Sequence, residues 1–80
     1  MNEQKARQID MILDYIDRFG SITPLDAMRD LGVMRLASRI TDLKRLGFPI
    51  VSKTEAVENR YGKKTYIKRY YIQEGGRHEN

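Results

Sequence analysis

The chain has 80 residues, of which 40% are hydrophobic and 32% are charged, a composition typical of one small soluble domain. It contains no cysteine, which excludes disulfides, thiolate chemistry and the usual cysteine-based zinc sites. No apolar run is long enough to cross a membrane, and residues 1–10 lack the hydrophobic stretch of a secretory signal. We therefore expect a cytoplasmic protein with no membrane partner.

Charge is distributed unevenly along the chain, whose formal net charge is +4. Residues 1–33 carry four basic and six acidic side chains, whereas residues 34–80 carry eleven basic and five acidic ones. A polyanion would therefore bind to the second half of the chain. Charge alone leaves another interpretation open, because many small soluble proteins carry a few surplus lysines.

An amphipathic helix is predicted from about Glu3 to Arg18, because apolar residues recur there at helical spacing between charged ones. The apolar stripe of this helix consists of Ile9, Ile12, Leu13, Ile16 and Phe19. Gly20 follows at the position where a glycine commonly ends a helix.

A second helix is predicted from Thr23, which is a good N-cap, to about Leu31. Pro24 at the first helical position costs no hydrogen bond, and Asp26 adds negative charge near the helix N-terminus. The inner stripe of this helix is expected to consist of Leu25, Met28 and Leu31, with Ala27 allowing close approach.

Gly32 turns the chain into a third helix, predicted from about Met34 to Leu46, where Gly47 and then Pro49 end it. Its buried stripe is expected to consist of Leu36, Ala37, Ile40 and Leu43. A continuous opposite face is expected from Arg35, Ser38, Arg39, Asp42 and Arg45.

After Pro49 the pattern changes to β-branched and aromatic residues, which predict strands over Ile50–Val57 and Thr65–Ile72. The segment between them, Glu58–Lys64, contains a glycine and is rich in basic residues. Two strands joined by such a loop form a β-hairpin, so the sequence predicts an α+β fold with a three-helix bundle followed by a two-stranded hairpin.

The core is expected to consist of Ile9, Ile12, Ile16, Leu25, Met28, Leu36, Ile40 and Leu43. From the hairpin, Ile50 and Ile72 should face inward, and the pattern does not decide which of Tyr70 and Tyr71 joins them. Residues 1–73 are expected to form one domain, and residues 74–80 a flexible polar tail.

The sequence offers no arrangement of side chains for catalysis. The single histidine, His78, lies in the polar tail, away from any group with which it could act as a base. The carboxylates of the first helix alternate with its apolar stripe and are most simply its solvated face. No glycine-rich phosphate loop is present, and no serine has a base beside it. We therefore expect no enzyme activity, no cofactor and no metal site.

The charged face of the third helix is the first candidate for a binding site. Arg35 and Arg39 can each donate two hydrogen bonds to guanine or bind phosphate, and Ser38 can donate or accept at a base edge. Asp42 repels phosphate, so it either holds Arg39 or Arg45 in place or accepts from a cytosine amino group. The alternative is an ordinary solvated helix face.

The hairpin loop is the second candidate. Arg60, Lys63 and Lys64 flank Gly62 and suit the phosphate backbone or the minor groove, where charge matters more than base identity. A plain soluble turn is the alternative. Further candidates for phosphate contacts are Lys44, Arg45 and Lys68.

The segments "SITPLDAMRDLG" and "RLASRITDLKRLG", followed by a strand and a basic turn, resemble the small winged helix-turn-helix proteins of phages and prophages. The resemblance extends from Gly20 to about Ile72. It implies a DNA-binding or regulatory three-helix domain in which Met34–Leu46 is the recognition helix and Thr23–Leu31 precedes it. It also implies a β-hairpin wing over about Asn59–Thr65. The same fold includes modules that bind protein.

Together these features predict a protein that binds double-stranded DNA in a sequence-specific way, as a phage or bacterial transcriptional regulator or as an accessory factor in recombination or replication. The candidate DNA-binding residues are Arg35, Ser38, Arg39, Asp42, Arg45, Arg60, Lys63 and Lys64. A different class is also open, a protein-interaction module such as a phage-encoded modulator of a host protein. Its surface would be formed by the hairpin tyrosines Tyr61, Tyr66 and Tyr70 or Tyr71. Without a long helix beyond the wing, we expect a monomer or a weak homodimer.

Overall fold

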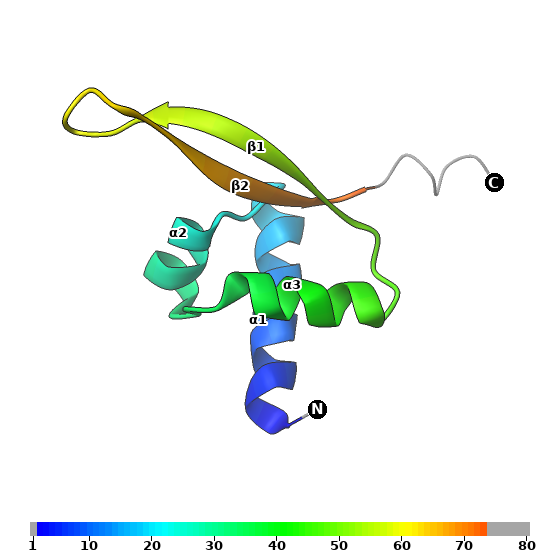
Figure 1. Ribbon diagram of the computed structural model, residues 1–80. Helices are drawn as coiled ribbons and strands as arrows, with labels where there is room; N and C mark the ends of the chain where they lie inside the picture. Colours follow the sequence, from blue (N-terminus) through cyan, green and yellow to red (C-terminus); the bar gives the residue numbers. More distant parts are fainter. Residues whose placement is uncertain (1, 74–80) are drawn as a thin grey trace.

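A computed structural model describes residues 2–73, in which three helices, the second formed by the consecutive segments α2 and η1, precede a β-hairpin (Figure 1). The elements in chain order are α1 (Glu3–Phe19), α2 (Pro24–Asp26), the π-helical segment η1 (Ala27–Leu31), α3 (Leu36–Arg45), β1 (Ile50–Glu58) and β2 (Lys64–Ile72). The predicted α+β fold, three helices followed by a two-stranded antiparallel hairpin, is confirmed. The tail predicted for residues 74–80, with His78, lies outside the described residues.

Local hydrogen bonds fix both ends of α1. The Asn2 side chain accepts a hydrogen bond from the Lys5 N–H at 2.8 Å, and Gly20, with φ of 90°, ends the helix. The buried residues of the helix are Ile9, Ile12 and Ile16, as predicted. Phe19 was predicted for the same stripe but is exposed at the last turn, where Ile22 enters the core instead.

The second helix begins as predicted but turns a different side to the core. Thr23 Oγ1 accepts from the Asp26 N–H at 3.1 Å, and Asp26 Oδ2 accepts from the Thr23 N–H at 3.0 Å. The prediction that Leu25 and Met28 are buried is wrong, because these residues are 57% and 45% exposed. Thr23 and Ala27 are buried in their place.

The small side chain of Ala27 accounts for this orientation. Ala27 is fully buried in η1, where a single methyl group lets η1 pack closely against α1. The chain then makes a wide π-helical turn, and the Val33 N–H donates to the Ala27 carbonyl at 2.9 Å. Val33 is buried as a result, so the turn after η1 contributes to the core instead of Met28.

The third helix begins at Leu36, two residues later than predicted. Arg35 is its N-cap and has a non-helical backbone, with φ of −124° and ψ of 59°. The buried residues of α3 are Leu36, Ile40 and Leu43, as predicted. Ala37 was predicted for the same stripe but is exposed, because it lies about 100° around the helix from Leu36.

The hairpin is attached to the helices through the base of both strands. Ile50 of β1 lies opposite Ile72 of β2; Ile50 is buried, and Ile72 is half-buried against the core. Of the two tyrosines that the sequence left open, Tyr70 is buried, whereas Tyr71 is half-buried. Ile22 pairs with Tyr70 through two backbone hydrogen bonds of 2.9 and 3.0 Å and so ties the loop before α2 to β2.

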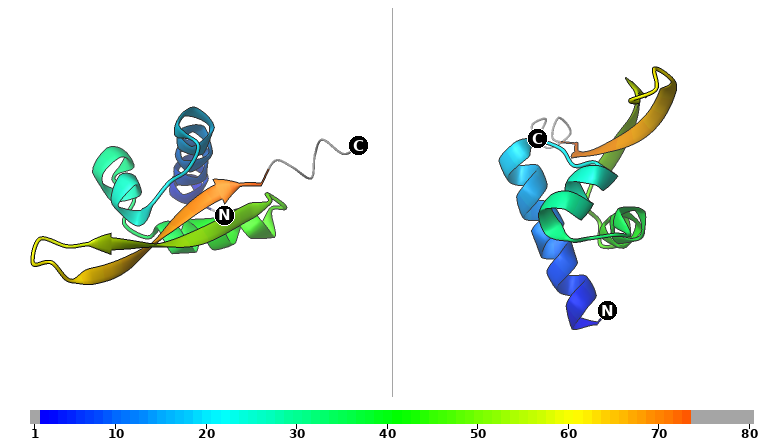
Figure 2. Two further views of the ribbon diagram at one scale, coloured as in Figure 1. Left: turned by 90° about the horizontal axis from the view of Figure 1, so that it is seen from above. Right: turned by 90° about the vertical axis from the view of Figure 1, so that its left-hand side faces the viewer.

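The third helix and the hairpin are arranged together on one side of α1. Seen from above, β1 lies over α3, whereas β2 lies toward α2, and the turn end of the hairpin extends beyond the helices as a wing (Figure 2). In the side view of Figure 2, α3 and the hairpin both lie on the same side of α1. The N-terminal half of α1 lies at the end of the molecule away from the hairpin (Figure 1).

Candidate nucleic-acid interface

We call the side of α3 that points away from the core the outer face of α3. Its residues are Ala37, Ser38, Thr41, Lys44 and Arg45. Ser38 is half-buried and the others are exposed. Thr41 was missed by sequence analysis because it carries no charge. Its position three residues after Ser38 and four before Arg45 is the signal that places it on the same face.

Arg39 and Asp42 do not lie on this outer face, so the predicted continuous face is wrong at both positions. Their side chains are only 13% and 17% exposed, and Arg39 Nε lies 3.0 Å from Asp42 Oδ2. The two atoms form an ion pair without a hydrogen bond between them. Arg39 Nη1 also donates to Gln8 Oε1 of α1, at 3.5 Å. Asp42 therefore pairs with Arg39, as one of the two roles left open for it requires.

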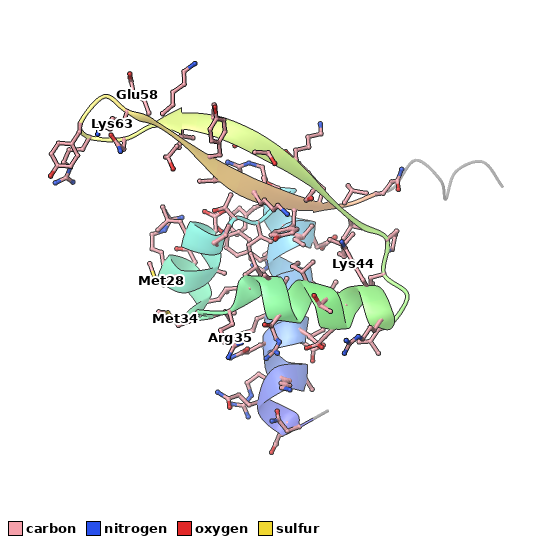
Figure 3. All side chains as sticks on the ribbon, in the orientation of Figure 1. Met28, Met34, Arg35, Lys44, Glu58 and Lys63 are labelled. Atoms are coloured by element: carbon pink, nitrogen blue, oxygen red, sulfur yellow. The ribbon has the colours of Figure 1, made fainter. Side chains whose placement is uncertain are left out.

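Arg35 lies at the start of α3, with an exposed side chain (Figure 3). Its carbonyl accepts hydrogen bonds from the Ser38 and Arg39 N–H groups at 3.1 and 3.3 Å, which begins the helix. Its side chain lines an open hollow of about 330 Å³ that also includes Lys5 and Gln8 of α1. Arg35 is therefore free to contact a ligand, in contrast to Arg39.

The wing ends in a loop, residues 59–63, that Asn59 organises. Asn59 Oδ1 accepts from the Tyr61 and Lys63 N–H groups at 2.9 and 3.0 Å, and the Asn59 carbonyl accepts from the Gly62 N–H. Gly62 adopts φ of 78°, which suits the left-handed position of such a loop. The basic side chains here, which we call the basic tip, are Arg60, Lys63 and Lys64. All three are exposed, and Figure 3 shows Lys63 at the end of the wing.

The titrating groups with shifted pKa values belong to contacts that hold elements together. Tyr15 Oη of α1 donates to Asp30 Oδ2 of η1 at 2.6 Å, and Arg29 Nε donates to Asp30 Oδ1 at 2.9 Å. The Arg29 hydrogen bond, followed by the one from Tyr15, lowers the pKa of Asp30 to about 2. The hydrogen bond to Asp30 raises the pKa of Tyr15.

A similar contact stiffens the hairpin. Arg69 Nε donates to Glu55 Oε2 across the strands at 2.9 Å, and Arg69 Nη1 donates to Ser21 Oγ at 3.1 Å. The hydrogen bond to Glu55 raises the pKa of the Arg69 guanidinium. This shift therefore reflects a structural ion pair on the hairpin, away from the outer face of α3 and the basic tip.

Residues 2–73 contain no group of three or more metal-ligating side chains. Among the helices of this described part, none is long and apolar enough to cross a membrane.

The fold and this exposed basic surface define the winged-helix class, in which a helix and a hairpin wing stand on one side of a small helical domain. Comparison with protein families agrees, because residues 7–75 match the family described as the winged helix-turn-helix domain. The chain belongs to this family, and membership suggests a DNA-binding domain. Searches of curated proteins and of solved structures gave no match.

Proposed function

We propose that this protein binds double-stranded DNA in a sequence-specific way and has no catalytic role. The outer face of α3 would enter the major groove, and the basic tip would contact the neighbouring backbone or minor groove. One observation carries the proposal: α3 and the wing lie on the same side of α1, so a single duplex can contact both (Figure 2).

The side chains would divide into those that read bases and those that bind phosphate. Arg35 and Ser38 lie at the N-terminal end of α3, from which a recognition helix reads base edges, and Thr41 continues the same face. Lys44 and Arg45 lie on the last turn, where their charge suits phosphate contacts. Arg39 and Asp42 would keep α3 in position against α1 instead of contacting bases.

Selection of bound sequences from a pool of random duplexes tests this function directly. We expect a short preferred site to be enriched, without a palindromic repeat if the protein binds as a monomer. A pool that stays random, together with no gel shift at low salt, would contradict the proposal.

Two substitutions separate base reading from backbone binding. Arg35→Ala should cost roughly 1–3 kcal/mol of binding free energy on the selected site and relax the preference for one base. Lys63→Ala should weaken binding to all duplexes alike and reduce the slope of log K against log salt by about 0.9. Arg7→Ala on α1 is the matched control, because Arg7 is exposed and forms no ion pair within residues 2–73. The division of roles fails if all three variants bind alike.

The biological role that fits such a domain is regulation of transcription, or an accessory function in recombination or replication, in a bacterial or phage setting. This protein would act in the cytoplasm, on DNA. Its alternative role as a protein-interaction module depends on the hairpin tyrosines, of which Tyr61 is exposed at the wing end. Binding to a protein partner combined with no affinity for any duplex at low salt would favour that alternative.

A further inference from the structure

The outer edge of β2 is unpaired over part of its length. Along an antiparallel strand, the backbone N–H and C=O groups of successive residues point alternately to the two edges. Tyr70 directs both its N–H and its C=O to Ile22. Lys68 and Tyr66 lie two and four residues earlier in the strand, so their N–H and C=O groups point to the same outer edge. Within residues 2–73, Ile22 is the one residue that pairs with this edge. Tyr66 and Lys68 therefore present unpaired donors and acceptors.

A largely apolar groove runs beside this edge, between the start of α2 and the hairpin. It has a volume of about 710 Å³. Its apolar walls are formed by Leu25, Val57, Tyr66 and Ile67. Leu25 and Tyr66 are 57% and 66% exposed, so the core does not use them. An open strand edge beside an apolar groove is the arrangement that binds an extended peptide by strand addition.

The free charge around the groove is positive. Asp26 and Arg69, which also line it, are each held in an ion pair, at 3.1 and 2.9 Å. Lys68 also lines the groove and forms no ion pair within residues 2–73. An occupant with a carboxylate side chain would complement Lys68.

We propose that the outer edge of β2 binds an extended segment of a partner protein in which apolar and acidic residues alternate. The backbone of this segment pairs with Tyr66 and Lys68 and extends the hairpin by one strand. Its apolar side chains pack against Leu25 and Ile67, and a carboxylate pairs with Lys68. The period of two along a strand delivers both kinds of side chain from one short segment.

The position of this edge allows the partner and a duplex to bind together. At the base of the hairpin β2 lies toward α2, whereas β1 lies over α3 (Figure 2), and none of the residues that line the groove belongs to α3. A partner held there would be brought to DNA without covering the helix that reads it. The peptide site itself does not depend on DNA binding, so the two proposals can fail separately.

Nuclear magnetic resonance of the ¹⁵N-labelled protein tests the site, with a blocked heptapeptide of alternating Glu and Val as the probe. We expect the amide signals of Tyr66 and Lys68 to shift and their hydrogen exchange to slow by about tenfold or more. Exchange at Ile67 and Arg69 should not change, because these amides already bond to β1. Unchanged Tyr66 and Lys68 amides at millimolar peptide would overturn the proposal.

Charge reversal provides a second test that does not depend on the amide assignments. Lys68→Glu should weaken binding of the Glu-Val peptide by roughly fivefold and strengthen binding of a Lys-Val peptide. Arg7→Glu changes the net charge equally on α1, which does not line the groove, and should leave both affinities within about twofold. If a short duplex shifts the Tyr66 and Lys68 amides and the peptide does not, this edge belongs to the DNA interface and the proposal is wrong.

Discussion

Arg39 and Asp42 lie three residues apart on α3, mostly shielded from solvent, with Arg39 Nε 3.0 Å from Asp42 Oδ2. Removing the guanidinium would leave the Asp42 carboxylate poorly solvated and without its ion-pair partner. We therefore expect Arg39→Ala to lower the free energy of unfolding by about 1–2 kcal/mol, measured by urea denaturation. Arg45→Ala on the exposed outer face should stay within about 0.5 kcal/mol of the parent. Equal losses in the two variants would contradict this assignment.

Asp30 gives the stability a dependence on pH. Its pKa lies at about 2, below its ordinary value of 3.8, because Arg29 and then Tyr15 donate hydrogen bonds to it. A carboxyl group with a lowered pKa stabilises the fold fully above its ordinary pKa, and the stabilisation is lost as the pH falls through about 2. We expect Asp30→Asn to lower Tm at pH 6, and the difference from the parent to shrink between pH 3.8 and about 2. A difference that stays constant over this range would exclude the mechanism.

At the scale of the elements, η1 packs against α1, and Ala27 of η1 is fully buried. Replacing its methyl group with a larger side chain would force η1 away from α1. Ala27→Leu should therefore lower the free energy of unfolding by about 1–3 kcal/mol. Leu25→Ala, which removes an exposed side chain, should change it by less than about 0.5 kcal/mol. The reverse order in thermal or urea unfolding would mean that the Leu25 side of the helix faces the core after all.

Periodicity predicted where helices and strands occur, because apolar spacing differs between the two. It did not predict which side of the second helix packs, since Leu25, Met28 and Leu31 share the same spacing whether or not they are buried. Side-chain size explains which side faces the core, because Ala27 permits closer packing between helices than Leu25 or Met28. Apolar periodicity also does not predict the π-helical turn, and this turn brings Val33 into the core.

The candidate site was predictable in part. The charged residues of the hairpin turn are exposed as the sequence indicated, because the strands on either side fix the place of the turn. Arg39 was misplaced, although its position three residues after Leu36 and four before Leu43 puts it beside the buried stripe. The contact with Gln8 joins residues 31 positions apart, and no local pattern reports such a contact.

At the scale of the whole molecule, the proposed interface combines two separate groups of cations, the last turn of α3 and the basic tip. If about four phosphates are contacted, raising the salt from ~50 to ~200 mM should weaken DNA binding by roughly a hundredfold. Fluorescence anisotropy with a labelled duplex measures this slope. An affinity that hardly changes with salt would contradict binding through both groups together.

The pairing of Ile22 with Tyr70 joins two parts of the chain that are 48 positions apart. Closing so long a loop carries an entropic cost that local contacts do not offset. The helices can therefore gain structure early, while the hairpin base must find Ile22 before the core under Tyr70 is complete. We therefore expect the step that sets the angle between the wing and the helices to be completed late in folding.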